Sequence, residues 1–342
     1  MARPERIELI PGIQEHWSAK PICCGMVILL WLLALPAGAA PPSAVSEPPP
    51  WAYPVTPPDF KPVPDDGRIR KVPDSSAGYT LTQVRDGFLA PDWHPEDHAK
   101  MPGIVAHGRK PDVLACGYCH RADGPGGPEN ASLAGLPYAY IVQQLSDYRS
   151  GRRSTALPKR IPQAWMMALA KAVTAEEVRE AARYFSSLKP RQNIRVVETD
   201  RVPKTYVANW FLGVQEGKES ELLGERIVET PENLEWFESR DARATFVAYV
   251  PSGSIGKGAA IVIGDKTTKA LACATCHGKN LKGQGAVPSI AGRSPSYVVR
   301  QLYEIQAGVR VGKGAALMKE PAARLSLDDM ISVAAYLATL QP

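Results

Sequence analysis

The feature that most constrains this chain is a five-residue pattern, Cys-x-x-Cys-His, that occurs twice. The first copy spans Cys116 to His120, and the second spans Cys273 to His277, at a constant offset of 157 residues. In each copy two thiols lie three positions apart, and an imidazole directly follows the second thiol. The fold therefore has to present the same three side chains together in two separate places.

Several kinds of chemistry use paired cysteines, and the spacing distinguishes them. Zinc sites combine two Cys-x-x-Cys pairs about 15–20 residues apart, and a thioredoxin-like redox pair is a single copy beside a βαβ pattern. A structural disulfide stays open as an alternative for an exported protein. The histidine after each pair favours covalently attached c-type haem. Each haem would then take two thioether-forming cysteines and one iron-binding histidine: Cys116, Cys119 and His120 for the first, and Cys273, Cys276 and His277 for the second.

Length and charge restrict the broad class. A chain of 342 residues predicts two domains or slightly more. Hydrophobic residues make up 44% of the sequence, which is enough for packed cores. The net charge is only +5, and the basic residues are interspersed with acidic ones, so we expect no nucleic-acid partner.

Residues 1–39 are predicted to be a signal peptide. Basic residues precede an apolar run at 22–35, and Ala37-x-Ala39 fits a cleavage site. The run is shorter than the ~20 residues that a membrane-spanning helix needs, which favours cleavage over a retained membrane anchor. Both cysteines outside the haem motifs lie in this segment, so the mature chain would keep four. We therefore expect a periplasmic protein, with membrane association through an uncleaved segment as the alternative.

Residues 40–98 are predicted to form a proline-rich arm. Eleven prolines lie between positions 41 and 73, and proline fixes φ and lacks a backbone donor. This composition predicts an extended, semi-rigid polyproline II segment. Trp51, Tyr53 and Phe60 are interleaved with the prolines, and we expect them to pack on the folded part of the chain rather than to contact a partner.

Three histidines near the end of this arm, His94, His98 and His107, are candidates for metal binding. The first two lie at positions i and i+4, but Pro95 interrupts a regular helix there. A further ligand does not stand out, so we expect these histidines to be surface or packing residues.

The two motifs belong to an internal repeat. The offset of 157 residues also takes Tyr140 to Tyr297 and Gly151 to Gly308, and beyond one loop the offset becomes 152. The repeat predicts two haem domains, at 99–190 and 256–342, each with a haem motif, a middle helix, a methionine in a loop and a C-terminal helix. Residues 191–255 are expected to be an irregular inter-domain segment of a few turns or short strands laid over the domains, without a core of its own.

Helical signals support the repeat. Residues 138–148 have helical spacing and end at Gly151, as glycine often follows a helix. Thr174 with Glu177 three residues later predicts a capping box at the start of the last helix of the first domain. Apolar residues then recur at helical spacing until Pro190 ends the pattern.

A methionine precedes the final helix of each domain. Met318 stands alone in its loop, whereas Met166 and Met167 compete in the first domain. Met166 precedes Val173 by seven residues, as Met318 precedes Leu325, so the repeat favours Met166. A thioether on the open side of a histidine-bound haem iron raises its reduction potential. We predict Met166 and Met318 as the second axial ligands; a core-filling role is the alternative.

Together these residues resemble class I cytochromes c, and the tandem arrangement resembles the two-domain, dihaem branch of periplasmic bacterial cytochromes c. The resemblance implies an all-α fold in which helices surround each haem and the N- and C-terminal helices cross. It implies iron ligation by His120 with Met166 and by His277 with Met318. In the family a proline carbonyl accepts the proximal histidine's Nδ1–H; Pro288 holds that place in the second domain, and Ala131 holds it in the first.

The function that follows is electron transfer by two covalently bound haems, between a periplasmic dehydrogenase or another cytochrome and a terminal acceptor such as an oxidase. An iron with both axial positions filled has no site for a substrate, so we predict no catalytic residue. A dihaem cytochrome c peroxidase and a fixed subunit of a dehydrogenase complex stay open as alternatives. Arg153 and Arg310 are expected either to approach haem propionates or to lie at solvated helix ends.

Overall fold

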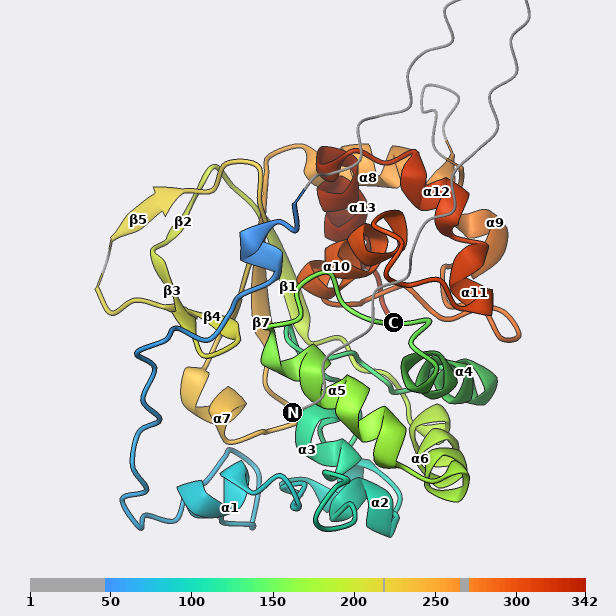
Figure 1. The fold of residues 1–342 in the computed structure, drawn as a ribbon. Helices are drawn as coiled ribbons and strands as arrows, with labels where there is room; N and C mark the ends of the chain where they lie inside the picture. The colour runs from blue at the N-terminus through green and yellow to red at the C-terminus, as the bar shows by residue number, and fades with distance from the viewer. Residues whose placement is uncertain (1–46, 218, 265–270) are drawn as a thin grey trace, which may run out of the picture. The chain divides into compact units, whose positions relative to one another are not determined.

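The computed structural model describes residues 47–217, 219–264 and 271–342 (Figure 1). The predicted signal peptide lies outside these residues, as do the first residues of the arm. Within these described ranges seven strands accompany the helices, all of them between residues 194 and 250. The predicted all-α class is therefore wrong for this middle segment, although the regions around the two haem motifs are helical. In the described part of the chain, no helix is long and apolar enough to cross a membrane.

The helices confirm the register of the repeat. The middle helices α4 (Tyr138–Arg149) and α10 (Pro295–Gln306) coincide at the offset of 157 residues. The final helices α6 (Ala175–Ser187) and α13 (Leu327–Thr339) coincide at the offset of 152 residues. The haem motifs themselves form short helices, α3 (Cys116–His120) and α9 (Ala274–His277).

The first helical region has its own apolar core, built mainly between α4 and α6. The predicted capping box is present: the Thr174 hydroxyl accepts from the backbone N–H of Glu177, whose carboxylate accepts from the N–H of Thr174. A short helix α2 (Gly103–Ala106) contacts α6. The loop expected around Met166 is instead a helix, α5 (Ile161–Ala172), because proline is tolerated in a helix's first turn and the following residues are strong helix formers.

The second helical region is organised by a close crossing of α8 (Ser254–Ile263) and α13. A Cβ built on Gly258 would lie only 1.9 Å from the carbonyl oxygen of Ser332, so only glycine allows this approach. The two short helices α11 (Lys313–Ala316) and α12 (Lys319–Ala323) flank Met318. This crossing is the terminal-helix arrangement that the resemblance implies.

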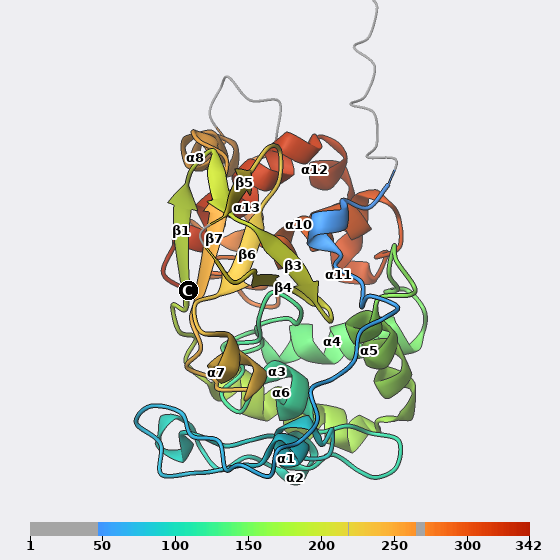
Figure 2. The same ribbon diagram turned by 90° about the vertical axis from the view of Figure 1, so that its left-hand side faces the viewer.

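The inter-domain segment forms short strands, as expected, but it also has a core of its own, which contradicts the expectation. Strands β1 (Ile194–Glu198) and β7 (Phe246–Val250) pair in parallel, and β7 also pairs with antiparallel β6 (Val228–Pro231). Figure 2 shows these three strands side by side, and the first two contact α13. Two further strand pairs and one helix complete the segment: β2 (Arg201–Pro203) with β5 (Ser220–Leu222), β3 (Thr205–Ala208) with β4 (Phe211–Val214), and α7 (Leu234–Glu238).

The core of this segment is aromatic. The Phe211 and Phe237 ring centroids lie 4.6 Å apart, and those of Phe237 and Phe246 lie 5.5 Å apart, all in edge-to-face geometry. Such pairs contribute beyond the area they bury. Ala338 of α13 packs into the same cluster, so the sheet is attached to the second helical region.

The arm packs on the folded part for most of its described length. A 3₁₀ turn, η1 (Pro50–Ala52), leads into Tyr53, which is 1% exposed and packs with Trp51 on the core of the second helical region. Phe60 is 40% exposed, so docking holds for two of the three aromatic residues. Residues 61–69 contain no helix or strand, and a short helix, α1 (Leu81–Arg85), follows.

Candidate haem sites

The first haem motif opens onto a large cavity. Cys116, Cys119 and His120 line it from α3, Met166 lines it from α5, and Phe185 lines it from α6. The empty space, counted to its open mouth, is about 1270 Å³. Both cysteines are free thiols, as thioether formation requires.

His120 is oriented by one backbone hydrogen bond. Its Nδ1 lies 2.8 Å from the carbonyl oxygen of Ala131, and a carbonyl can only accept, so Nδ1 carries the proton and Nε2 keeps its lone pair. Burial lowers the pKa of His120 to about 4, so the imidazole is neutral at physiological pH. A neutral imidazole held in one tautomer is the form that binds a metal. The carbonyl of Ala131 thus takes the place that a proline carbonyl holds in the family.

His277 repeats this geometry in the second region. Its Nδ1 donates to the carbonyl oxygen of Pro288, also at 2.8 Å, and burial lowers its pKa. Cys273 and Cys276 are free thiols on the same short stretch. The two copies of the motif therefore share one local structure as well as one sequence.

The two methionines lie in different settings. Met166 lines the cavity that contains His120, whereas Met167 is not among the lining residues. Met318 packs against Ile305, and it also borders the core that Cys273 contacts. The structure thus places His120 and Met166 in the lining of one cavity, and it places Cys273 and Met318 at the border of one apolar core.

Arg153 and Arg310 form an interface between the two halves of the chain, a role that the sequence analysis did not predict. Arg153 and Arg310 are only 6% and 9% exposed, so the expectation of solvated helix ends is wrong. The Arg153 guanidinium donates to Gln144 at 2.9 Å, Tyr297 at 3.2 Å and Gln301 at 2.8 Å.

Arg310 makes the repeat-related set of contacts. Its guanidinium donates to Gln301 at 3.2 Å, Tyr140 at 2.9 Å and Gln144 at 3.1 Å. The backbones of the two arginines also pair as an antiparallel bridge. Each arginine therefore contacts its own half and the repeat-related tyrosine and glutamine of the other half. The 157-residue offset that matches these residues was the only sequence signal for this interface.

Buried charges form the polar wall of the first cavity. Arg300 and Glu304 come from α10, and Glu129 comes from the loop after α3; all three are buried. Arg300 donates to the backbone carbonyl of Ala52 at 2.8 Å. Among the described residues, the Nε of Arg153 and of Arg300 have no hydrogen-bond partner. Unpartnered guanidinium donors at the edge of this cavity fit a ligand that carries carboxylates, as haem does.

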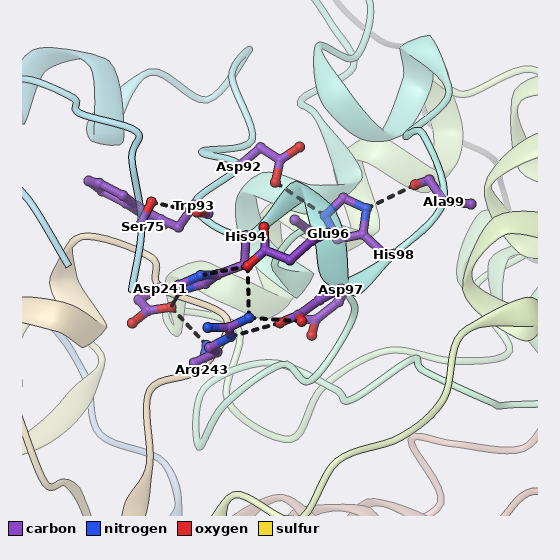
Figure 3. A network of polar contacts seen from close by, with 12 residues as sticks. Ser75, Asp92, Trp93, His94, Glu96, Asp97, His98, Ala99, Asp241 and Arg243 are labelled. Carbon is purple, nitrogen blue, oxygen red and sulfur yellow. Dashed lines mark hydrogen bonds and ion pairs between the residues drawn. The ribbon is translucent and has the colours of Figure 1, made fainter. Parts of the chain in front are cut away.

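The histidines of the arm belong to a different network, which Figure 3 shows. His94 is buried, and its Nε2 lies 3.1 Å from a carboxylate oxygen of Asp241; His98 Nε2 lies 3.2 Å from one of Asp92. Arg243 holds the carboxylate of Asp97 beside them. His94 and His98 therefore pack against carboxylates, whereas His107 is exposed. In the described residues no three side chains of the metal-binding types come together.

Two motifs of this kind, on helices that repeat and with each histidine neutral and oriented, define the class as a c-type haem protein. A cytochrome c family model matches residues 261–341. Cytochrome c-554(547) of Halothiobacillus neapolitanus is 34% identical over 84 residues, which are 22% of this chain and 92% of that protein. The chain belongs to the cytochrome c family.

Other similarities extend over more of the chain. The thiosulfate dehydrogenase electron acceptor of Thiomonas intermedia is 26% identical over 231 residues, which cover 67% of this chain and 79% of that protein. A solved thiosulfate dehydrogenase structure from Marichromatium purpuratum is 27% identical, with a TM-score of 0.48 over 70% of this chain. This chain spans 39% of that longer one.

Proposed function

We propose that this protein is a periplasmic dihaem cytochrome c that carries electrons and performs no catalysis. Haem 1 is attached to Cys116 and Cys119, and haem 2 to Cys273 and Cys276. The observation that carries the proposal is the repeated histidine geometry: in both halves the imidazole is neutral and donates Nδ1–H to a carbonyl 2.8 Å away. The proposed iron ligands are His120 with Met166 and His277 with Met318.

When bound, each haem accepts and releases one electron at its iron, and the chain controls how readily this happens. The Nδ1 hydrogen bond fixes each imidazole plane and makes its Nε2 more basic. A thioether on the opposite side leaves no position for a reactant. Arg153 and Arg300 border the first cavity and would pair with carboxylates of the bound haem. Such pairing would help to set the reduction potential of haem 1.

The proposed electron donor is an enzyme of the thiosulfate dehydrogenase kind. A relative that is 26% identical over 67% of this chain is named as the electron acceptor of such an enzyme. The proposed downstream acceptor is a terminal oxidase or another cytochrome. Two haems in one chain allow the protein to hold two electrons.

Mass spectrometry of the mature protein, together with a redox titration followed by near-infrared absorption, tests the haem count and the ligand assignment. We expect a mass corresponding to the chain plus two haems, and a weak near-infrared absorption from a thioether–iron bond in each ferric haem. Met166→Ala and Met318→Ala should each remove the contribution of one haem, whereas Met167→Ala should remove none. Rapid peroxide turnover by the reduced protein would instead favour the peroxidase alternative.

A second experiment tests the partner. The oxidised cytochrome is mixed with a purified thiosulfate dehydrogenase and thiosulfate, and haem reduction is followed by stopped-flow absorbance. We expect reduction only when both enzyme and thiosulfate are present. If an unrelated periplasmic dehydrogenase reduces the protein equally fast, the proposed donor is wrong, while the carrier function stands.

A further inference from the structure

The helix that carries Met166 packs on α4 within its own domain, but its first half takes no part in the apolar core there. Of the 12 residues of α5, only Ala170 is buried, and it lies near the C-terminal end. Met166 lies in the middle of the helix, directly after Trp165, which is 40% exposed. Among the described residues, Leu169 and Ala172 are the residues of α5 that pack against the core between α4 and α6, and both follow Met166.

The inter-domain segment, which is inserted between the two helical regions at residues 191–255, supplies a contact to this first half of α5. At the tip of the β3–β4 hairpin, the Trp210 ring lies edge-to-face on Trp165, with ring centroids 5.5 Å apart and an interplanar angle of 69°. Arg160, the residue before α5, is fully buried and donates to the Trp210 carbonyl oxygen at 3.3 Å. One hairpin tip thus touches both the start of α5 and the turn that precedes Met166.

The hairpin tip is itself fixed. Ala208 pairs directly with Phe211, so Asn209 and Trp210 form a two-residue turn, with Asn209 at a φ of +68°. Thr56 of the arm donates its hydroxyl proton to the Asn209 side-chain oxygen at 2.7 Å. Trp210 also packs on the aromatic core of the inserted segment. A tip held by the turn, the arm and the core can act as a rigid support.

We propose that Trp210 is a positioning residue for haem 1: it braces the first half of α5 and thereby holds the Met166 sulfur where it can bind iron. The inference rests on the proposed function, because it requires Met166 to be a ligand. It assigns a role to the inserted segment in tuning one haem and not the other. Removing the brace releases α5 locally, so the thioether–iron bond of haem 1 breaks more easily while that of haem 2 is unaffected.

The test uses the mature holoprotein in a Met318→Ala background, where only haem 1 contributes the near-infrared thioether band. Trp210→Ala is expected to raise the fraction of ferric haem 1 that has lost the thioether by about 2- to 10-fold, the range typical of one aromatic pair. The haem 1 potential should fall accordingly. Trp210→Phe, which keeps a ring, should restore most of the band. Tyr206→Ala is the matched control, since Tyr206 is an exposed aromatic residue on the same hairpin.

The results separate the two claims. If Met166→Ala leaves the haem 1 band intact, the ligand assignment fails. If Met166→Ala removes the band but Trp210→Ala behaves like Tyr206→Ala, the brace is refuted and the proposed function stands. Should Trp210→Ala not incorporate haem, Trp165→Ala, which removes the other ring of the pair, decides: it should weaken the haem 1 band, and a band as strong as that of Tyr206→Ala refutes the brace.

Discussion

At the scale of single residues, the candidate iron ligands depend on backbone atoms as much as on the side chains in the motif. His120 and His277 reach the same tautomer through the carbonyl groups of Ala131 and Pro288. Since every residue carries a carbonyl, the identity of the partner residue affects only the stiffness of the loop. Side chains outside the motifs are therefore free to tune other properties, including the dependence of stability on pH.

His98 provides a pH-dependent contribution to stability. The hydrogen bond to Asp92 raises the pKa of His98 above its ordinary value near 6.5. A raised pKa in the folded state means that stabilisation is complete below about pH 6.5 and is lost as the pH rises through the folded value. His98→Gln should therefore lower the free energy of unfolding more at pH 5.5 than at pH 9, measured by guanidinium titration. An equal loss at both pH values would contradict this assignment; His107→Gln, at an exposed position, is the control.

At the scale of elements, local signals predicted the helices that repeat and missed those that depend on distant contacts. The Thr174 capping box and the 157-residue register located α6, α4 and α10 because both signals lie in neighbouring residues. The sequence predicts a loop where α5 lies because Pro158 and Pro162 look like helix breakers, although Pro158 precedes the helix and Pro162 lies in its first turn. Short strands are expected in the inter-domain segment, but the parallel pairing of β1 with β7 is not, because the two strands lie some fifty residues apart and short apolar strands give no signal for such pairing.

The crossing of α8 and α13 predicts opposite outcomes for two neighbouring glycines. An added Cβ at Gly258 would meet the Ser332 carbonyl at 1.9 Å, whereas one at Gly256 would meet nothing within 4 Å. We expect Gly258→Ala to lower the free energy of unfolding by about 1–3 kcal/mol or more, through overpacking. Gly256→Ala should raise it by about 0.5–1 kcal/mol, since alanine is the better helix former. Thermal unfolding of both variants checks the pair, and effects of the same sign would show that the helices do not cross so closely.

At the scale of the whole described chain, the two halves meet through residues that the repeat itself supplies. The eight motif and methionine residues could be proposed from the sequence because their chemistry is local. The polar wall of the first cavity could not, because Arg300 and Glu304 come from the other half and belong to no motif. The same holds for the paired arginines, whose partners became evident only when both halves were present together.

Arg310 offers a test of this interface, because its guanidinium bonds to Tyr140 and Gln144 of the other half. Removing a buried, charge-assisted donor leaves those acceptors unpaired, so Arg310→Ala should lower the free energy of unfolding by roughly 2–4 kcal/mol. Because the contact joins the halves, guanidinium unfolding should also separate into two transitions, followed through the loss of ligation at each haem. Arg179→Ala should change the free energy by less than about 1 kcal/mol, since both this arginine and its ion-pair partner Glu176 are largely exposed to solvent. A single, unshifted transition in Arg310→Ala would mean that the halves are held together by the apolar core and the arm alone.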